Sequence, residues 1–130
     1  LLLAVPITKV VAVRELETDV LHPATGGRYL SFRHAMVPVV ELDEQLGLAS
    51  TAPAMHGVVI EDGRDLAALA VQQIVGYREV VLKPLGSPLE QLGWFSGAAI
   101  LGDGRPMLML DVAHAMRSHS TAEDTRVEAR

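Results

Sequence analysis

The sequence predicts a mostly β domain with a minor share of helix. Turn-forming residues recur at short intervals along the 130-residue chain, and short runs rich in Val, Leu, Ile and Met lie between them. This spacing is typical of an all-β barrel or sandwich. Apolar residues make up 49% of the chain, which is enough to bury a core, and the length suits one compact domain or two very small halves.

Three pairs of apolar runs are predicted to form β-hairpins. The third pair gives the strongest signal, because its turn at 102–105 contains an Asp-Gly step that supplies the positive φ that tight turns require. Ahead of the hairpins, 1–7 is interpreted as a strand whose beginning is missing, since it lacks the basic segment and initiating Met of a signal peptide. The paired runs are 29–32 with 36–42, 58–60 with 66–71, and 98–101 with 107–110.

Two short helices are predicted, at 41–46 and 112–117, each after the second strand of a hairpin. Gly47 suits the left-handed position that ends the first helix, and Asp111 suits the N-cap of the second. The apolar runs 37–42 and 107–112, which lead into the two helices, are similar in sequence and suggest that the chain has two similar halves. Exposed connections are expected at 18–27, 49–56 and 86–93.

The last residues differ in composition from the rest of the chain. Residues 118–130 alternate Ser, Thr, Glu, Asp and Arg and have almost nothing to bury, so burial cannot offset the entropy of ordering them. We predict a folded domain over 1–117 and a polar tail or linker over 118–130.

Composition excludes several classes of function. Eleven Lys and Arg against 16 Asp and Glu give a net charge of −5 with no basic cluster, which argues against binding to nucleic acid. No apolar run reaches the ~18 residues of a membrane span, so direct membrane insertion is not expected. The absence of cysteine removes disulfides and thiolate chemistry and suits a reducing compartment, with the cytoplasm as the default location.

A search for chemistry finds no assembled catalytic, metal or cofactor site. The five histidines are scattered, and His114 with His119 lacks the spacing of a helical zinc site. Ser96 lacks the leading glycine of a nucleophile turn. Trp94 and Phe95 are adjacent, so in a strand their side chains would point to opposite faces, and one is expected to be exposed as an interface anchor.

Several strings are more specific than composition. The sequence REVVLKPLG at 78–86, SGAAILGDGR at 96–105 and VPVVEL at 37–42 resemble the C-terminal regulatory domain of the chemotaxis histidine kinase CheA. The resemblance covers 1–117 and implies the CheW-like fold, which is two intertwined five-stranded SH3-like barrels packed on a shared hydrophobic seam. The two-half pattern and the hairpins agree with this expectation.

The resemblance also implies a function without catalysis. In such two-component kinases the phosphotransfer chemistry belongs to other domains, so no catalytic, cofactor-binding or metal-binding residue is expected here. The domain would bind a CheW-like coupling protein and the cytoplasmic tip of chemoreceptors, and pass receptor state to the other domains of the parent kinase. Its expected location is the cytoplasm, at membrane-associated receptor arrays.

Six residues are predicted to bind partners. By resemblance, Val10, Val11 and Arg33 line the groove that meets receptors. Exposure reasoning adds Met36 and the pair Trp94 and Phe95, of which one is expected to be exposed. The sequence departs from the family pattern at 34–35, where His-Ala replaces a glycine-containing turn, and at 72–73, where Gln-Gln stands in place of a common acidic residue.

Two other hypotheses remain open. The chain could be a free-standing CheW-type adaptor, which has the same fold. It could also be a small ligand-binding or hydrolytic β-barrel that uses Ser96, Asp103 and a histidine, although nothing in the sequence brings these residues together.

Overall fold

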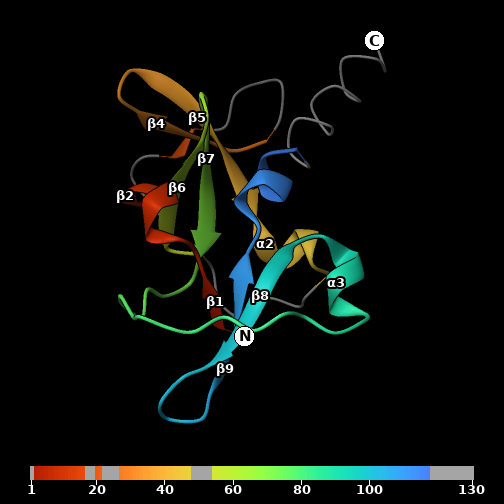
Figure 1. Cartoon of the computed structure of the whole chain (residues 1–130). Helices are drawn as coiled ribbons and strands as arrows, with labels where there is room; N and C mark the ends of the chain where they lie inside the picture. Colours follow the sequence, from red (N-terminus) through yellow and green to blue (C-terminus); the bar gives the residue numbers. More distant parts are fainter. Residues whose placement is uncertain (1, 17–19, 22–26, 48–53, 118–130) are drawn as a thin grey trace. The chain divides into compact units, whose positions relative to one another are not determined.

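The computed structural model describes residues 2–16, 20–21, 27–47 and 54–117. The chain forms two compact units: unit 1 contains Leu1–Lys9 and Gly76–Arg130, and unit 2 contains Val10–Val75. The chain therefore contributes to unit 1, builds unit 2, and returns to unit 1 (Figure 1). This connectivity confirms the predicted division into two intertwined halves.

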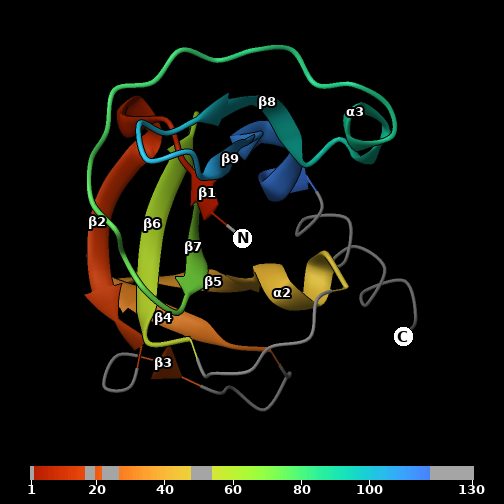
Figure 2. The same ribbon diagram turned by 90° about the horizontal axis from the view of Figure 1, so that it is seen from below.

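Unit 2 is a six-stranded sheet with strand order β2-β6-β7-β5-β4-β3. All neighbouring strands are antiparallel except β5 and β7, which are parallel. Figure 2 shows β6 lying between β2 and β7, as the pairing requires. The elements are β2 (Val10–Glu15), β3 (Val20–Leu21), β4 (Tyr29–Phe32), β5 (Ala35–Glu41), α2 (Leu42–Gln45), β6 (His56–Asp62) and β7 (Asp65–Val71).

One buried cluster fills unit 2. Leu16, which follows β2, packs in the same cluster as Leu30 and Phe32 of β4, although β2 and β4 lie far apart in the strand order. The sheet must curl to bring these strands together, so its inner face encloses a core. The buried members are Leu16, Leu30, Phe32, Val37, Val39, Val59, Ala68 and Ala70.

The two predicted hairpins of unit 2 are confirmed. β6 and β7 are joined by a two-residue turn in which Gly63 has a φ of 65°. β4 and β5 are joined by Arg33 and His34, whose φ values are 51° and 64°. Positive φ at both central residues matches the right-handed twist of the strands, but it is unusual for residues other than glycine.

Unit 1 is a three-stranded sheet with strand order β1-β9-β8. β1 is parallel to β9, and β8 forms the predicted third hairpin with β9 through a turn that contains Gly104 at a φ of 90°. Residues 112–117 are helical, as predicted. The other elements are β1 (Leu2–Ala4), η1 (Ile7–Lys9), α3 (Leu89–Leu92), β8 (Phe95–Ile100) and β9 (Pro106–Leu110).

Two details differ from the sequence predictions. The expected loop at 86–93 contains the short helix α3, which ends at Gly93 with a φ of 78°. Over the described residues the strands divide into six and three instead of five and five. In unit 1 the segment 76–86 forms no strand and contacts β8 through one isolated bridge, between Lys83 and Ala98 (Figure 2, green to teal).

The mostly β class with minor helix is confirmed. The predicted tail at 118–130 lies outside the described residues, as does most of the connections at 18–27 and 49–56. Within the part of the chain that is described, no helix is both long and apolar enough to span a membrane.

Candidate protein-docking surfaces

The tip of the β4–β5 hairpin presents two of the predicted partner-binding residues. Arg33 is exposed in the turn, and Met36 is 50% exposed on β5 opposite Ser31. Strand alternation explains the outward position of Met36, because its neighbour Val37 is buried in the core cluster. The structure thus confirms that Arg33 and Met36 lie on the surface.

Two arginines cover the buried ring of Phe32 at this tip. The guanidinium carbon of Arg33 lies 4.8 Å from the ring centroid, and that of Arg14, on β2, lies 5.0 Å from it. Phe32 is only 2% exposed, so the two cations lie over an aromatic ring that also belongs to the core. We call Arg14 and Arg33 the cationic tip.

The two arginines of the cationic tip have no acidic partner among the described residues of unit 2. No ion pair joins Arg14 or Arg33 to any residue that the structure describes, whereas Arg28 forms a salt bridge with Glu41. Two cations near one ring repel each other, and a chain with a net charge of −5 has acidic residues available to pair with them. Sequence reasoning missed Arg14, since only the curl of the sheet brings β2 to β4.

Val10 and Val11 are partly buried at the start of β2. Val11 packs against the core cluster of unit 2, and the strand pairing shifts register between Val10 and Ala12. A bulge of this kind re-aims side chains along the strand. Their predicted place in a receptor groove stays a prediction.

The expected exposure of Trp94 or Phe95 is wrong. Trp94 is 8% exposed and Phe95 is 7% exposed. β8 begins at Phe95, so Trp94 precedes the strand and the alternation that predicted opposite faces does not apply to the pair. The Trp94 ring meets the edge of the His114 ring, with centroids 4.7 Å apart. Neither aromatic ring is available as an exposed anchor in this structure.

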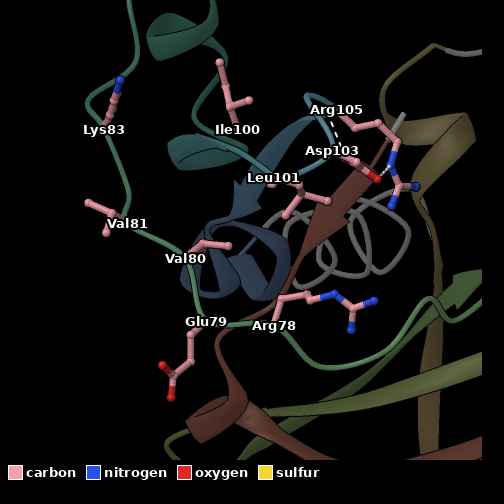
Figure 3. A pocket seen from close by; sticks show the side chains of 10 residues that line it. Arg78, Glu79, Val80, Val81, Lys83, Ile100, Leu101, Asp103 and Arg105 are labelled. Atoms are coloured by element: carbon pink, nitrogen blue, oxygen red, sulfur yellow. Dashed lines mark hydrogen bonds and ion pairs between the residues drawn. The ribbon is translucent and has the colours of Figure 1, made fainter.

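A second surface, in unit 1, was not predicted. Residues 78–81, 83, 100–103 and 105 line an open groove with a volume of about 610 Å³, which we call the edge groove (Figure 3). Val81 and Ile100 are 83% and 70% exposed beside it. The run of three apolar residues at 80–82 carried a signal, because an extended segment cannot turn three consecutive side chains to one interior.

Asp103 at the end of this groove is engaged by Arg105. The Arg105 backbone N–H donates to Oδ1 at 3.1 Å, and the Arg105 side-chain Nε–H donates to Oδ2 at 2.7 Å. The backbone hydrogen bond first, and the side-chain one second, hold the pKa of Asp103 below its ordinary value. In the described parts of the chain no hydrogen bond joins Asp103 to Ser96 or to a histidine, so the groups that the hydrolase hypothesis needs are not brought together.

Comparison with known proteins gives consistent matches. The family model described as CheW-like domain matches residues 1–120. Chemotaxis protein CheA of Bacillus subtilis (strain 168) is 33% identical over 111 residues, which are 83% of this chain and 16% of that protein. Chemotaxis protein CheA of Salmonella typhimurium is 33% identical over 112 residues, which are 83% of this chain and 17% of that protein.

A solved structure matches over most of both chains. The crystal structure of the scaffolding protein TtCheW from Thermoanaerobacter tengcongensis superposes with a TM-score of 0.61 at 18% identity, covering 82% of this chain and 79% of that chain. At this identity the likeness concerns the fold. The chain spans less than a fifth of the length of the two curated relatives.

Proposed function

Because the chain belongs to the CheW-like domain family, we propose that it is the docking domain of a CheA-type histidine kinase, which binds a CheW-type coupling protein and chemoreceptor tips. The sequence matches favour a kinase over a free-standing adaptor, since both curated relatives are CheA at 33% identity while the solved scaffolding protein is 18% identical. The domain contributes contacts, and phosphotransfer takes place elsewhere in the parent protein.

The cationic tip is the observation that carries this proposal. Arg33 is exposed at the end of a hairpin, and both its backbone and its side chain are constrained, by a turn with positive φ and by the Phe32 ring. A non-glycine residue held at positive φ stores strain, and such residues concentrate at functional sites. A guanidinium stacked on an aromatic ring is pre-organised, so less side-chain entropy is lost when a partner binds.

Met36 adds an apolar contact to the same hairpin. It is half exposed on the outward face of β5, where a flexible thioether can adapt to a partner surface. Met36 faces outward from the sheet, and the Arg33 guanidinium lies over the ring of Phe32, whose side chain points inward. The hairpin tip thus carries an apolar and a cationic side chain, and Met and Arg are both enriched at protein interfaces. We therefore place Arg33 and Met36 in contact with the partner.

The test is calorimetric titration of the chain with the CheW-type protein of the same organism. We expect heat of binding, and we expect Arg33→Ala to weaken the affinity by roughly tenfold, as for a moderate interface hot spot. Arg64→Ala is the matched control, because Arg64 is also an exposed arginine in a two-residue hairpin turn of unit 2. Circular dichroism confirms that both variants fold.

Two outcomes would contradict the proposal. One is the absence of binding heat with the coupling protein across a range of temperatures, which guards against an accidental zero enthalpy. The other is equal affinity for Arg33→Ala and Arg64→Ala. A parallel titration with receptor fragments, with the same two variants, separates receptor contact from coupling-protein contact.

A free-standing adaptor is the second candidate. It is favoured by the match to TtCheW, which extends over 82% of this chain and 79% of that scaffolding protein. The gene sequence that encodes the residues before Leu1 distinguishes the two candidates. An ATP-binding kinase domain encoded there would exclude the adaptor.

A further inference from the structure

The outer edge of β8 has a gap in its hydrogen bonding. Ala98 exchanges both backbone hydrogen bonds with Lys83, at 2.7 and 3.0 Å. Because a strand directs the backbone groups of every second residue to the same edge, the N–H and C=O of Ile100 also face this side. In the described parts of the chain, no backbone group is bonded to Ile100 there. The edge is open at Ile100.

The opposite wall of the edge groove is equally unpaired. In the antiparallel register set by Lys83 and Ala98, Val81 would pair with Ile100, but the single bridge is not extended to them. The segment 78–82 instead diverges from the hairpin and leaves the edge groove between the two walls (Figure 3). Both walls therefore present backbone donors and acceptors, and each carries an exposed apolar side chain.

The charges in the edge groove favour an acidic occupant. Arg78 hydrogen-bonds only to the carbonyl of its neighbour Tyr77, and no salt bridge joins Arg78 or Lys83 to a residue in the described ranges. Asp103 is already paired with Arg105, and Glu79 points away from Arg78 (Figure 3). Two cations thus remain available beside the open edge.

We propose that the edge groove binds an extended, acidic segment of a partner protein, which adds to the free edge of β8 as a strand. The backbone groups at Ile100 supply strand pairing, Val81 and Ile100 contact an apolar side chain, and Lys83 and Arg78 meet carboxylates. This site lies in unit 1 and uses no residue of the cationic tip, so it does not depend on the proposed function. An acidic segment is favoured over a second copy because both copies would bring the same two cations.

The probe is a capped eight-residue peptide made of two copies of Val-Thr-Glu-Thr, so that Val and Glu lie on one face of the added strand and Thr lies on the other. NMR spectra of the ¹⁵N-labelled chain follow the titration, and a peptide with Lys in place of Glu is the control ligand. We expect shift changes confined to the amides of 78–83 and 96–105, and weaker binding of the Lys peptide. Amide exchange of Ile100 is expected to slow when the Glu peptide binds.

Two variants test the geometry. Ile100→Pro removes an N–H that faces the open edge and not β9, so the β8–β9 hairpin keeps its bonds. The affinity for the peptide is expected to fall about fivefold, the equivalent of one net hydrogen bond. Val81→Glu places a negative charge beside the peptide at an 83% exposed site and is expected to abolish the preference for Glu over Lys. Ile7→Glu, 61% exposed in the same unit, is the matched control and should bind like the parent.

The results decide the proposal in either direction. Equal shifts with the Glu and Lys peptides, or unchanged affinity in both groove variants with an intact spectrum, would overturn it. Sedimentation showing a concentration-dependent dimer with slowed exchange at Ile100 would assign the edge to a second copy and would also overturn it. Loss of the Glu-peptide shifts in Val81→Glu alone supports it even if Ile100→Pro fails to fold.

Discussion

The sheets of the two units differ in how completely their outer strands are covered. In unit 2 the six strands curl until Leu16, which follows β2, shares one buried cluster with residues of β4, and the cationic tip covers the ring of Phe32 at the margin of this cluster. In unit 1 three strands leave β8 with a single bridge along its outer edge. Unit 2 therefore presents fixed side chains at its surface, whereas unit 1 presents an unpaired backbone edge.

The same passage from strand to helix also occurs in both units with different stabilisation. In unit 1, Asp111 accepts a hydrogen bond from the N–H of His114 at 3.1 Å and so caps the helix at 112–117. In unit 2, Glu41 occupies the N-cap of α2 without a capping bond, and its carboxylate pairs with Arg28 instead. Both units thus pass from a strand into a short helix, but a side-chain cap stabilises this junction in unit 1 and an ion pair stabilises it in unit 2.

The largest expected effect comes from the core of unit 2. Leu30→Ala removes a side chain that is 0% exposed in the core cluster, and we expect a loss of about 2–5 kcal/mol of unfolding free energy. Urea denaturation followed by circular dichroism measures it. Val13→Ala, at a site 46% exposed on the same unit, is the control and should change stability by less than about 0.5 kcal/mol. Similar losses in the two variants would contradict a closed core in unit 2.

A smaller effect is expected where β8 meets the segment that contains Lys83. A Cβ at Gly97 would lie 3.2 Å from the carbonyl oxygen of Lys83 and 3.5 Å from Cβ of Leu82, so Gly97→Ala must push the segment outward. We expect a cost of about 1–3 kcal/mol, with faster amide exchange at Lys83 and Ala98. Gly86→Ala is the control, because nothing lies within 4 Å of its added Cβ.

Amide exchange in Gly97→Ala also shows whether the bridge between Lys83 and Ala98 affects unit 1 alone. If Gly97→Ala accelerates exchange along β8 and leaves the strands of unit 2 unchanged, the bridge is a local feature of unit 1. Unchanged exchange at Lys83 and Ala98 would show that the bridge does not hold the segment in solution.

Local chemistry explains what the sequence could predict. The Asp111 cap, the turn at Gly104 and the hairpin turn at Gly63 depend on a few neighbouring residues, so their sequence signals are direct. The exposure of Arg33 and Met36 follows from a hairpin and strand alternation in the same way.

Non-local packing explains what the sequence could not predict. The contact of Arg14 with Phe32 requires the curl of a six-stranded sheet, and the edge groove requires 78–82 to diverge from β8. Burial of Trp94 depends on where β8 begins and on the helix that carries His114. No short window of sequence contains these relations.

The cap of the second helix should matter more than the acidic residue at the corresponding place in unit 2. Asp111→Ala is expected to lower the free energy of unfolding by about 1 kcal/mol, because it leaves the N–H of His114 without its partner. Asp111→Asn keeps a side-chain oxygen that can accept this bond and should be nearly as stable as the parent chain. Glu41→Ala removes a partly exposed ion pair and is expected to cost less than about 1 kcal/mol. Thermal and urea unfolding of the three variants measure the order. A larger loss of unfolding free energy for Glu41→Ala than for Asp111→Ala would contradict the prediction that the cap is the stronger interaction.

The smallest effect concerns the β8–β9 turn and depends on pH. Because the Arg105 backbone N–H is the main cause of the lowered pKa of Asp103, Arg105→Ala should leave that pKa below the ordinary value, although less so than in the parent chain. With a folded-state pKa below the unfolded one, the carboxylate stabilises the turn above the unfolded pKa, and this stabilisation is lost as the pH falls through the folded pKa. NMR titration of the Asp103 carboxyl carbon measures both chains, and Asp103→Asn should show no pH-dependent change from this site. A return to the ordinary pKa in Arg105→Ala would mean that the guanidinium, and not the turn itself, holds the charge.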